Sequence, residues 1–441
     1  MKGIVISGMG SGAGKTSVTS GLLSKMSVKY EIQAFKVGPD FIDPMFHTIA
    51  TGRQSRNLDT FMMSKDKIRN YVGTTSKGAD LCVVEGVRGL FEGLSGTTDE
   101  CSTAEMAKLL GFPVILVVDS RSLTRSAAAM INGFKDFDKD LNIAGVILNN
   151  ISGKQHEEKI LDAMERYSDI EVLGTIRRDK NMSTEQRYLG LKTPRSRKEI
   201  ISMESLVQNI DEERILDATE DVEFNTQSVF TERPRQGIKA AIPRDDAFCF
   251  YYQDNIDCMR ASGIDIEFFS PVKGEFVDAD MYYLGGGYPE LHAADIENNT
   301  DFREGLRNAS DEGKVVIGEC GGLMAMCENI CGSDGKHKAA GIFKADAKIS
   351  GRHGPTYTIT NSTEHNKFFK GVVKGHEFHY SEIEPHGKYE FGFEMTRGQG
   401  ITGTHDGLVY KNSIGSYMHQ HALSKDDWFG DILKSIERQI K

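Results

Sequence analysis

The feature that most constrains the fold of this chain is the N-terminal stretch "GIVISGMGSGAGKTSVTSGLL", residues 3–23. An apolar run leads into a glycine-rich turn, and a helical pattern begins with Lys15 and Thr16. Glycines allow the backbone to wrap closely around an anion, and the N-terminus of a helix offers the positive end of its dipole. The order of strand, glycine loop and helix therefore predicts an α/β domain with a phosphate-binding loop after its first strand.

The loop suggests a role for each of its functional residues. Lys15 can reach the terminal phosphates of a nucleotide, and the Thr16 hydroxyl can ligate Mg²⁺. The match to the pattern G-x-x-x-x-G-K-[ST] is displaced by one residue, because Met9 occupies the first glycine position. The alternative is a glycine-rich turn that binds no ligand. Close approach of the backbone to the phosphates is expected at Gly10, Gly12 and Gly14.

Short apolar runs alternate with amphipathic segments through both halves of the chain. In the first half the predicted strands are 3–7, 32–37, 80–86, 113–119 and 143–149. This rhythm is typical of a mostly parallel sheet covered by helices on both faces. The second half predicts a further α/β structure, with strands at 238–245, 264–271, 279–287 and 314–320.

The periodic pattern fades between the two halves. From about 194 to 236 the chain holds helical stretches followed by a polar tail, which we interpret as a linker. The expected organisation is therefore a P-loop domain over 1–193, a helical and linker region over 194–236, and a second α/β domain over 237–441.

Acidic residues follow two of the predicted strands in the first half. Asp40 and Asp43 lie in "FKVGPDFIDP", and Glu85 ends the next strand in "VVEGVRG". The carboxyl ends of parallel strands share one edge of a sheet, where ligands collect. Carboxylates at that edge can hold Mg²⁺ on nucleotide phosphates. The alternative is that these side chains cap helices or are solvated loop charges.

A second chemical centre is predicted at Cys320, in "VVIGECGGLMAM" (315–326). The stretch indicates a strand, a sharp turn and a helix whose N-terminus would stabilise a thiolate. The amides of Gly286 and Gly287 could stabilise an oxyanion. His419 or His421 could activate the thiol. A lone cysteine is more often a buried small hydrophobe, and we interpret Cys82, Cys249, Cys258, Cys327 and Cys331 in that way, whereas a place near the ATP edge is the alternative for Cys101. His47, His156, His292 and His405 are interpreted as ordinary surface or core histidines.

Composition limits the partners of this chain. Its 64 acidic residues exceed its 53 basic ones, which gives a formal net charge of −11 and disfavours a general nucleic-acid binder. The cysteines are odd in number and scattered, without CxxC spacing, as in proteins of a reducing cytosol. The sequence contains neither a signal peptide nor an apolar stretch long enough to cross a membrane. We therefore expect a cytoplasmic protein with small-molecule partners.

The first half resembles a known enzyme domain. The motifs "GMGSGAGKTSVTSGLL", "FKVGPDFIDP", "NLDTFMM" and "EGVRGLFEG" resemble the ATP-dependent amidoligase domain of cobyrinate a,c-diamide synthases, which is related to dethiobiotin synthetase. In that family ATP phosphorylates a substrate carboxylate, and ammonia attacks the acyl phosphate. The resemblance implies that Lys15 and Thr16 bind phosphate and Mg²⁺. It further implies metal or carboxylate-activating roles for Asp43 and Glu85 with Asp40 nearby, adenine recognition by Asn149, and anion binding by Lys36 and Arg88.

The second half is similar to class I glutamine amidotransferases of the cobyric acid synthase type. The motifs are "GGGYPELHAADIENN", "GECGGLMAM", "GHEFHYS", "GSYMHQHALS" and "RDDAFCFYYQDN". This similarity implies that Cys320 is the nucleophile of a glutaminase, that His419 is its base, and that His421 is the second His of the family's H-x-H. The type lacks the usual Glu of the triad, and no Glu is found near His419 in the sequence. Ala422 departs from the family, where a bulky aromatic residue is common.

Two branches of the family share this architecture. One amidates the a and c acetate groups of cobyrinate toward cobalamin, and the other amidates those of Ni-sirohydrochlorin toward coenzyme F430 in methanogens. The stretches "EGVRGLFEG" and "DSRSLTRSAAA" resemble the methanogen type more closely. The alternative from another class is a P-loop switch or partitioning ATPase, or a scaffold. Arg187 is a further candidate for binding the substrate carboxylates, and a homodimer is the candidate assembly.

Overall fold

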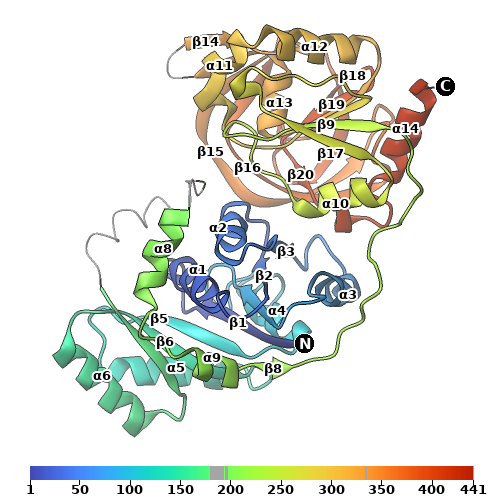
Figure 1. Cartoon of the computed structure of the whole chain (residues 1–441). Helices are drawn as coiled ribbons and strands as arrows, with labels where there is room; N and C mark the ends of the chain where they lie inside the picture. Colours follow the sequence, from blue (N-terminus) through green and yellow to red (C-terminus); the bar gives the residue numbers. More distant parts are fainter. Residues whose placement is uncertain (179–192, 194–196, 333–334, 441) are drawn as a thin grey trace. The chain divides into compact units, whose positions relative to one another are not determined.

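The computed structural model describes residues 1–178, 193, 197–332 and 335–440. Arg187 lies outside the described residues. The chain divides into two compact units, Met1–Val229 and Phe230–Lys441. Each unit is built around its own sheet, as Figure 1 shows. The prediction of two α/β domains is confirmed.

The first unit is organised around a parallel sheet. Its strand order is β3-β2-β4-β1-β5-β6-β7. The short strand β8 pairs antiparallel with the first residues of β1. All five predicted strands of this half are present, whereas the short strands β3 and β8 and the peripheral β7 were not predicted. The strands are β1 (Lys2–Gly8), β2 (Ile32–Val37), β3 (Arg56–Leu58), β4 (Leu81–Glu85), β5 (Val114–Asp119), β6 (Ile143–Ile151), β7 (Val172–Arg177) and β8 (Glu220–Asp221).

Helices connect these strands and pack against one another in groups. α1 packs on α2 and α8, α3 on α4, and α5 on α6. Buried apolar side chains of the strands, such as Ile4, Val84 and Leu116, lie beneath them. The helices are α1 (Lys15–Met26), α2 (Ile42–Thr51), α3 (Lys65–Thr75), α4 (Thr103–Leu110), α5 (Arg125–Phe137), α6 (Lys154–Tyr167), α8 (Arg197–Leu206) and α9 (Glu212–Asp217).

The segment expected to be helical and linker, 194–236, divides between the two units. Its helix α8 packs so closely on α1 that a Cβ on Gly21 would lie 2.5 Å from the Met203 carbonyl oxygen. The Ser24 hydroxyl also donates to the Glu204 carboxylate at 2.6 Å. The first unit continues to Val229, so most of this segment belongs to it.

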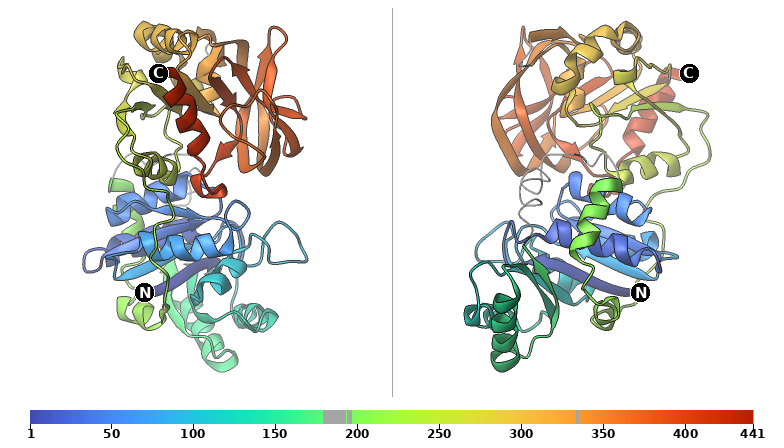
Figure 2. Two further views of the ribbon diagram at one scale, coloured as in Figure 1. Left: turned by 90° about the vertical axis from the view of Figure 1, so that its right-hand side faces the viewer. Right: turned by 60° about the vertical axis from the view of Figure 1, so that its left-hand side comes forward.

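The second unit contains one mixed sheet of twelve strands. Strands β10-β9-β11-β12-β19 are parallel, and β18, β17, β15, β13 and β14 continue the sheet. The long strands β15 and β16 pair antiparallel and stand at one side of this unit (Figure 2). The strands are β9 (Lys239–Pro243), β10 (Asp265–Phe269), β11 (Met281–Leu284), β12 (Val315–Glu319), β13 (Cys327–Gly332), β14 (Gly335–Lys338), β15 (Phe343–Ser362), β16 (Val372–Pro385), β17 (Glu390–Arg397), β18 (His405–Tyr410), β19 (Ser413–Ser416) and β20 (His419–Gln420).

Helices cover both faces of this second sheet. One core cluster joins the sheet to α11 (Ala293–Asn298), α12 (Thr300–Asp311) and α13 (Gly321–Met326), and includes Phe302 and Leu323. A second cluster joins the other face to α10 (Gln253–Ala261) and α14 (Gly430–Ile440), and includes Met259 and Ile432. The parallel strands are therefore enclosed between two apolar layers, which positions the carboxyl ends of β11 and β12 rigidly.

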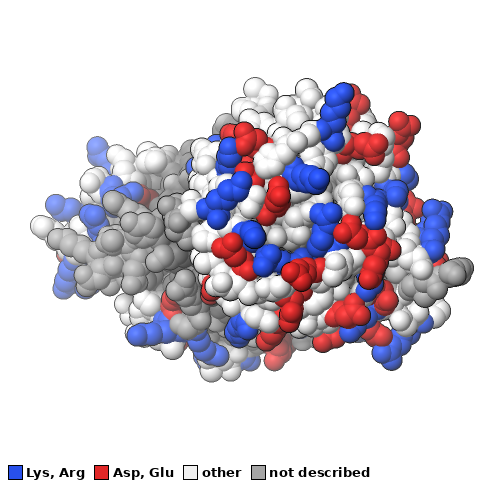
Figure 3. Space-filling model, turned by 90° about the horizontal axis from the view of Figure 1, so that it is seen from above, with Lys and Arg blue, Asp and Glu red and all other residues white. Residues whose placement is uncertain are grey.

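The described surface and helices are consistent with the acidic composition. On the face shown in Figure 3, Lys and Arg alternate with Asp and Glu, and the described residues form no continuous basic area there. Within the described ranges, every helix is too short or too polar to cross a membrane.

Candidate active sites

The predicted phosphate loop connects β1 to α1. Gly12 has φ 80° and Gly14 has φ 94°, a backbone region that favours glycine. Gly14 is also the N-cap of α1, and a Cβ there would lie 2.3 Å from the Asn149 amide nitrogen. At Gly10, in contrast, a Cβ would meet no atom within 4 Å. The local packing therefore requires glycine at 14, the backbone conformation favours it at 12, and Gly10 has space around it.

Lys15 and Thr16 start α1 at the carboxyl edge of the sheet. The Lys15 ammonium donates to the Arg88 carbonyl oxygen, and the Thr16 hydroxyl donates to Glu85 Oε1 at 2.8 Å. Burial, together with the nearby Lys36, lowers the pKa of Lys15. The expected loop residues are thus directly connected to the acidic residue at the end of β4.

A buried charge cluster lies beside the loop. Lys36 Nζ lies 2.6 Å from Asp43 Oδ2 and 3.0 Å from Glu85 Oε1, and it donates to the Gly86 carbonyl oxygen at 2.9 Å. Burial opposes the charged ammonium, but the Asp43 and Glu85 carboxylates raise the pKa of Lys36. Burial also favours a protonated Glu85, but Lys36 and His47 hold its pKa well below the usual range. Burial and the charge of Asp40 raise the pKa of Asp43.

The structure separates the role of Asp40 from that of Asp43. Asp40 Oδ1 accepts the backbone N–H groups of Ile42 and Asp43 at 2.8 and 3.1 Å, so it caps the start of α2. Asp43 lies one turn before His47 on the same helix and points into the charge cluster with it. Asp40 is therefore next to the cluster, in the capping position that the sequence left as an alternative.

His47 is a site residue that the sequence interpretation missed. Its side chain is fully buried, and Nε2 lies 2.7 Å from Glu85 Oε2. Nδ1 lies 3.4 Å from the Ser55 hydroxyl. The i, i+4 spacing of Asp43 and His47 on a helix that follows a strand could have revealed that they share a face.

Arg88 and Asn149 lie on either side of the loop. Arg88 adopts φ 51° and is exposed, and its Nη1 donates to the Gly93 carbonyl oxygen at 3.3 Å. Asn149, at the end of β6, donates from Nδ2 to the Ala13 carbonyl oxygen at 2.9 Å. The structure thus brings Asn149 to the phosphate loop. The Arg88 side chain instead contacts Gly93, in the loop that follows β4.

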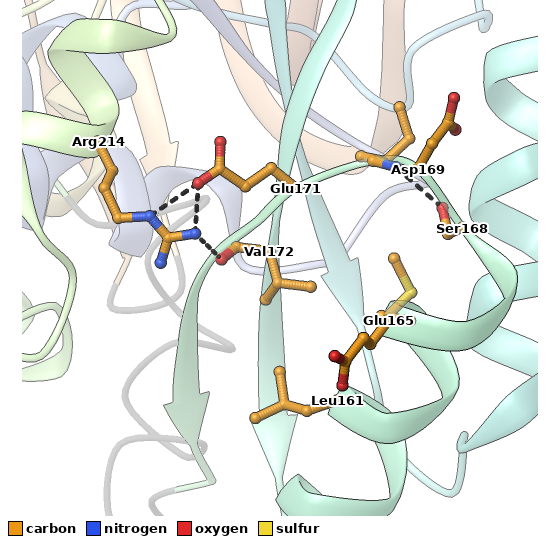
Figure 4. Close-up of a pocket in the computed structure, with 9 residues that line it drawn as sticks. Leu161, Glu165, Ser168, Asp169, Glu171, Val172 and Arg214 are labelled. Atoms are coloured by element: carbon orange, nitrogen blue, oxygen red, sulfur yellow. Dashed lines mark hydrogen bonds and ion pairs between the residues drawn. The ribbon is translucent and has the colours of Figure 1, made fainter.

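Two cavities flank this sheet at opposite ends of its strands. A cavity of about 230 Å³ beside Asn149 is lined by Arg121, Asn150, His156 and Arg178 among others. A larger one, of about 350 Å³, lies between the end of α6 and the start of β7, where Arg214 donates to Glu171 and to the Val172 carbonyl oxygen (Figure 4). The larger cavity is at the amino ends of the strands, so it is separate from the phosphate loop.

The predicted nucleophile occupies a strained turn in the second unit. Cys320 directly follows β12, precedes α13 and has φ 49° and ψ −100°, an unfavourable conformation for a residue with a side chain. The neighbouring glycines leave no space for side chains, since a Cβ on Gly322 would lie 2.2 Å from the Leu284 carbonyl oxygen. The Cys320 thiol lies 3.8 Å from the Phe378 carbonyl oxygen. This geometry matches a nucleophile elbow.

His419 is the histidine that faces Cys320. It is 1% exposed, its ring stacks on His376 with centroids 5.0 Å apart, and a Cβ on Gly286 would lie 2.6 Å from its Cε1. Burial disfavours the charged ring, but the hydrogen bond with Cys320 and the carboxylate of Glu319 raise the pKa of His419 to about 9. The His419 ring is therefore protonated at neutral pH and can donate to the Cys320 thiol or to a leaving group.

The sequence around His419 contains no Glu, but the structure brings a Glu from another strand beside its ring. Glu319 Oε2 lies 3.6 Å from His419 Nδ1, and the Glu319 side chain is 4% exposed. Glu319 is far from His419 in the sequence, because it directly precedes Cys320 at the end of β12.

His421 is engaged elsewhere. Its Nε2 lies 3.1 Å from Asp254 Oδ2, and its Nδ1 accepts the Leu423 backbone N–H at 3.1 Å. Both ring nitrogens are thus occupied, which leaves His419 as the histidine available to the thiol.

The two glycines expected to stabilise an oxyanion differ in the structure. The Gly286 N–H donates to the Phe250 carbonyl oxygen at 3.1 Å, which is at odds with its expected role. The Gly287 nitrogen would lie 3.0 Å from a Cβ on Gly321, so it borders the start of α13. The amides of Gly287 and Gly321 are therefore the better candidates for an oxyanion beside Cys320.

The remaining cysteines differ from Cys320 in their surroundings. Cys82, Cys258 and Cys327 are buried, and burial raises the pKa of Cys82 to about 11 and that of Cys258 to about 12. Cys101 is also buried, with its pKa raised to about 12 by burial. These thiols are poor nucleophiles, as the sequence interpretation expected.

Comparisons with known proteins agree with the division into two domains. A family model described as the CobQ/CobB/MinD/ParA nucleotide binding domain matches residues 4–188, and one described as the CobB/CobQ-like glutamine amidotransferase domain matches residues 239–427. Three similar proteins are each named cobyrinate a,c-diamide synthase. The protein of Methanosphaera stadtmanae is 41% identical, with 97% of each chain covered. That of Methanobrevibacter smithii is 37% identical over 97% of this chain and 98% of its own. That of Methanococcus vannielii is 39% identical over 99% of this chain and 100% of its own. The chain therefore belongs to the cobyrinate a,c-diamide synthase family of glutamine-dependent, amide-forming ligases.

Proposed function

We propose that this chain converts the a and c acetate carboxylates of a tetrapyrrole into amides, with glutamine as the nitrogen donor and ATP with Mg²⁺ as the activating pair. The observation that carries this proposal is the presence in one chain of a P-loop with a buried Lys36–Asp43–Glu85 cluster and of a thiol–imidazole pair, Cys320 and His419. The thiol–imidazole pair would supply ammonia, and the P-loop cluster would supply the activated carboxylate that ammonia attacks. The names of the relatives support cobyrinate as a substrate.

The second unit would release ammonia from glutamine. The Cys320 thiolate attacks the side-chain carboxamide carbon, so that a C–S bond forms and the C–N bond breaks. The His419 imidazolium gives its proton to the leaving nitrogen, which departs as ammonia. Water then hydrolyses the thioester to glutamate and returns the thiol. The Gly287 nitrogen, which would lie 3.0 Å from a Cβ on Gly321 at the start of α13, supports the proposal as a donor to the oxyanion.

The first unit would activate the carboxylate. A carboxylate is a poor electrophile, so its oxygen first takes the terminal phosphoryl group of ATP, and ammonia then displaces phosphate from the acyl phosphate. Phosphoryl transfer between two anions requires dense positive charge. Lys15, the N-terminus of α1 and Lys36 supply it at the end of the sheet. The exposed guanidinium of Arg88 would receive the anionic substrate.

The residues of this unit fit a magnesium ion. Thr16, Asp43 and Glu85 would hold it, and its charge would neutralise the phosphate oxygens. All three offer oxygen ligands, which Mg²⁺ prefers, and the Thr16 and Glu85 oxygens already lie 2.8 Å apart. Asp43 and Glu85 also share the Lys36 ammonium, which shows that their carboxylates converge.

The proposed physiological substrate is Ni-sirohydrochlorin, with cobyrinate as a second substrate. The support is the resemblance of "EGVRGLFEG" and "DSRSLTRSAAA" to the methanogen type. The test is a parallel assay of the full chain with each ring, ATP and glutamine labelled with nitrogen-15 in its amide. We expect two labelled nitrogens in the product by mass spectrometry, with the higher kcat/KM for the nickel ring. No label in either product would overturn the substrate proposal.

A switch ATPase or scaffold is not favoured. Such a protein has no use for a glutaminase, yet the second half matches a glutamine amidotransferase family over residues 239–427.

A further inference from the structure

A buried carboxylate directly precedes the nucleophile. Glu319 is the last residue of β12, and its side chain is shielded from solvent. Oε2 accepts the Tyr283 hydroxyl at 3.0 Å and lies 3.6 Å from His419 Nδ1. Oε1 lies 3.3 Å from the Gln420 backbone nitrogen, which donates to it. The carboxylate is therefore held on both oxygens and directed at the ring that faces Cys320.

Hydrogen bonds from Asn255 fix the residues that hold Glu319. Asn255 on α10 donates from Nδ2 to the Tyr283 hydroxyl at 3.0 Å and to the Gln420 carbonyl oxygen at 2.8 Å. The same amide thus ties together the strand that carries Tyr283 and the strand that carries His419. Because Glu319 occupies the Nδ1 side of the His419 ring, Nε2 is left for the thiol of the next residue, Cys320.

We propose that Glu319 is the positioning residue of this glutaminase: its carboxylate fixes the orientation of His419 through Nδ1 and stabilises the imidazolium that forms when Cys320 loses its proton. This inference rests on the proposed glutaminase function and adds a residue to it. The third member of the triad would then come from the position before the nucleophile, whereas the sequence pattern around His419 shows none.

The charges around the ring favour this role. A negative carboxylate beside an imidazole raises its pKa, and that of His419 is raised to about 9. His376 of β16 stacks on the ring, but burial lowers its pKa well below the usual value, so it is neutral. His379, whose pKa is lowered to about 4 by burial, is neutral as well, and burial keeps Tyr283 protonated. Glu319 and Cys320 are thus the groups that can balance an imidazolium.

The chain offers a matched control for a buried histidine–carboxylate pair. Asp254 and His421 lie 3.1 Å apart in the same unit and are both buried, but both nitrogens of His421 are occupied away from the thiol. Replacing Asp254 tests the general cost of losing such a pair. Replacing Glu319 tests, in addition, its effect on His419.

The experiment compares Glu319→Gln, Glu319→Asp and Asp254→Asn with the wild type in the full chain. Glutamate release from glutamine is measured from pH 6 to pH 10. For Glu319→Gln we expect kcat to fall at least about tenfold with KM for glutamine changed less than about twofold. The alkaline limb of the profile, near pH 9 in the wild type, should move down by about one pH unit. Glu319→Asp should keep the alkaline limb in place and recover part of kcat.

Several outcomes would overturn the inference. An alkaline limb that stays in place in Glu319→Gln would do so, and so would an equal shift in Asp254→Asn. Ammonia-dependent amide formation and the melting temperature report whether each variant is folded. If Glu319→Gln does not fold, Glu319→Asp decides, and an unchanged kcat in that variant overturns the inference. A wild-type chain that releases no glutamate from glutamine would instead overturn the proposed function itself, and this inference with it.

Discussion

The Thr16 hydroxyl donates a hydrogen bond to Glu85 Oε1 at 2.8 Å, although the two residues belong to different strand–helix connections. Thr16 begins α1 after β1, and Glu85 ends β4, which is paired with β1 in parallel. The carboxyl ends of neighbouring parallel strands bring them together. This contact joins the phosphate loop to the acidic cluster. Because both belong to the first unit, a change at Glu85 should affect the chemistry of that unit alone.

Replacement of Glu85 by Gln should therefore abolish ATP-dependent amidation. The change removes one charge that Lys36 and His47 both contact, and it removes an expected Mg²⁺ ligand. We expect ammonia-dependent turnover to fall about 100-fold or more. Glutamate release from glutamine in the same variant is the internal control and should persist. Ammonia-dependent turnover at the wild-type rate would contradict the assignment of Glu85.

Replacement of His47 by Ala should weaken the same cluster through Glu85. The buried Glu85 Oε2 loses a partner at 2.7 Å, and a cavity replaces the ring. We expect the free energy of unfolding of the first unit to fall by about 2–4 kcal/mol, with lower ammonia-dependent turnover. Urea denaturation measures the first effect. The matched control is His405→Ala, at a partly exposed position in the other unit, where loss of stability should be within about 0.5 kcal/mol.

The sequence predicted those parts of both sites that depend on local pattern. Apolar runs locate the strands, glycines at positive φ mark the phosphate loop, and "GECGG" marks the turn at Cys320. The rule that parallel strands share a carboxyl edge predicted that Glu85 lies at the same edge of the sheet as Lys15 and Thr16.

Most of the site features that the sequence did not predict depend on contacts between segments distant in the chain. Glu319 reaches His419 because β19 pairs with β12, with Ser416 opposite Glu319, and the chain continues from Ser416 to His419 in β20. The Gly286 amide is occupied by Phe250, which belongs to an irregular segment after β9. His47 could have been recognised from its helical spacing to Asp43, but an isolated histidine carries no signal of burial.

Replacement of Cys320 by Ala should separate the two reactions. The nucleophile of the glutaminase is lost, so glutamine-dependent amidation should fall by about 10³-fold or more. Amidation with added ammonium should remain, because the phosphate loop lies in the other unit. Cys331→Ala is the matched control, since that thiol is half-buried on β13 and should be dispensable. Full use of glutamine by Cys320→Ala would show that another group is the nucleophile.

The buried His379 should make the stability of the chain depend on pH. Burial lowers its pKa to about 4, from 6.5 in the unfolded chain. Between these values the unfolded state binds the additional proton, so stability is highest above pH 6.5 and decreases as the pH falls toward 4. The whole shift of the His379 pKa corresponds to a loss of about 3 kcal/mol in the free energy of unfolding. About 2 kcal/mol of this loss should fall between pH 7 and pH 5, and urea denaturation at these two pH values measures it.

His379→Asn is the control for this pH dependence. Asn can still donate to the Ser381 carbonyl oxygen, which His379 contacts at 2.7 Å, but it does not titrate. The variant should lose less stability than the wild type between pH 7 and pH 5. Equal losses in the two proteins would assign the pH dependence to other buried groups.

Two glycines of the phosphate loop should respond differently to the same added methyl group. In Gly14→Ala the Cβ would lie 2.3 Å from the Asn149 amide, at a backbone φ of 94°, so the loop or the Asn149 side chain must move. We expect a loss of about 1–3 kcal/mol in the free energy of unfolding and weaker ATP binding, measured by urea denaturation and calorimetry. In Gly10→Ala the Cβ meets no protein atom within 4 Å, so stability should be unchanged. Gly14→Ala could instead be as stable as Gly10→Ala and bind ATP as tightly as the wild type. That result would show that the close packing of Asn149 does not position the phosphate loop.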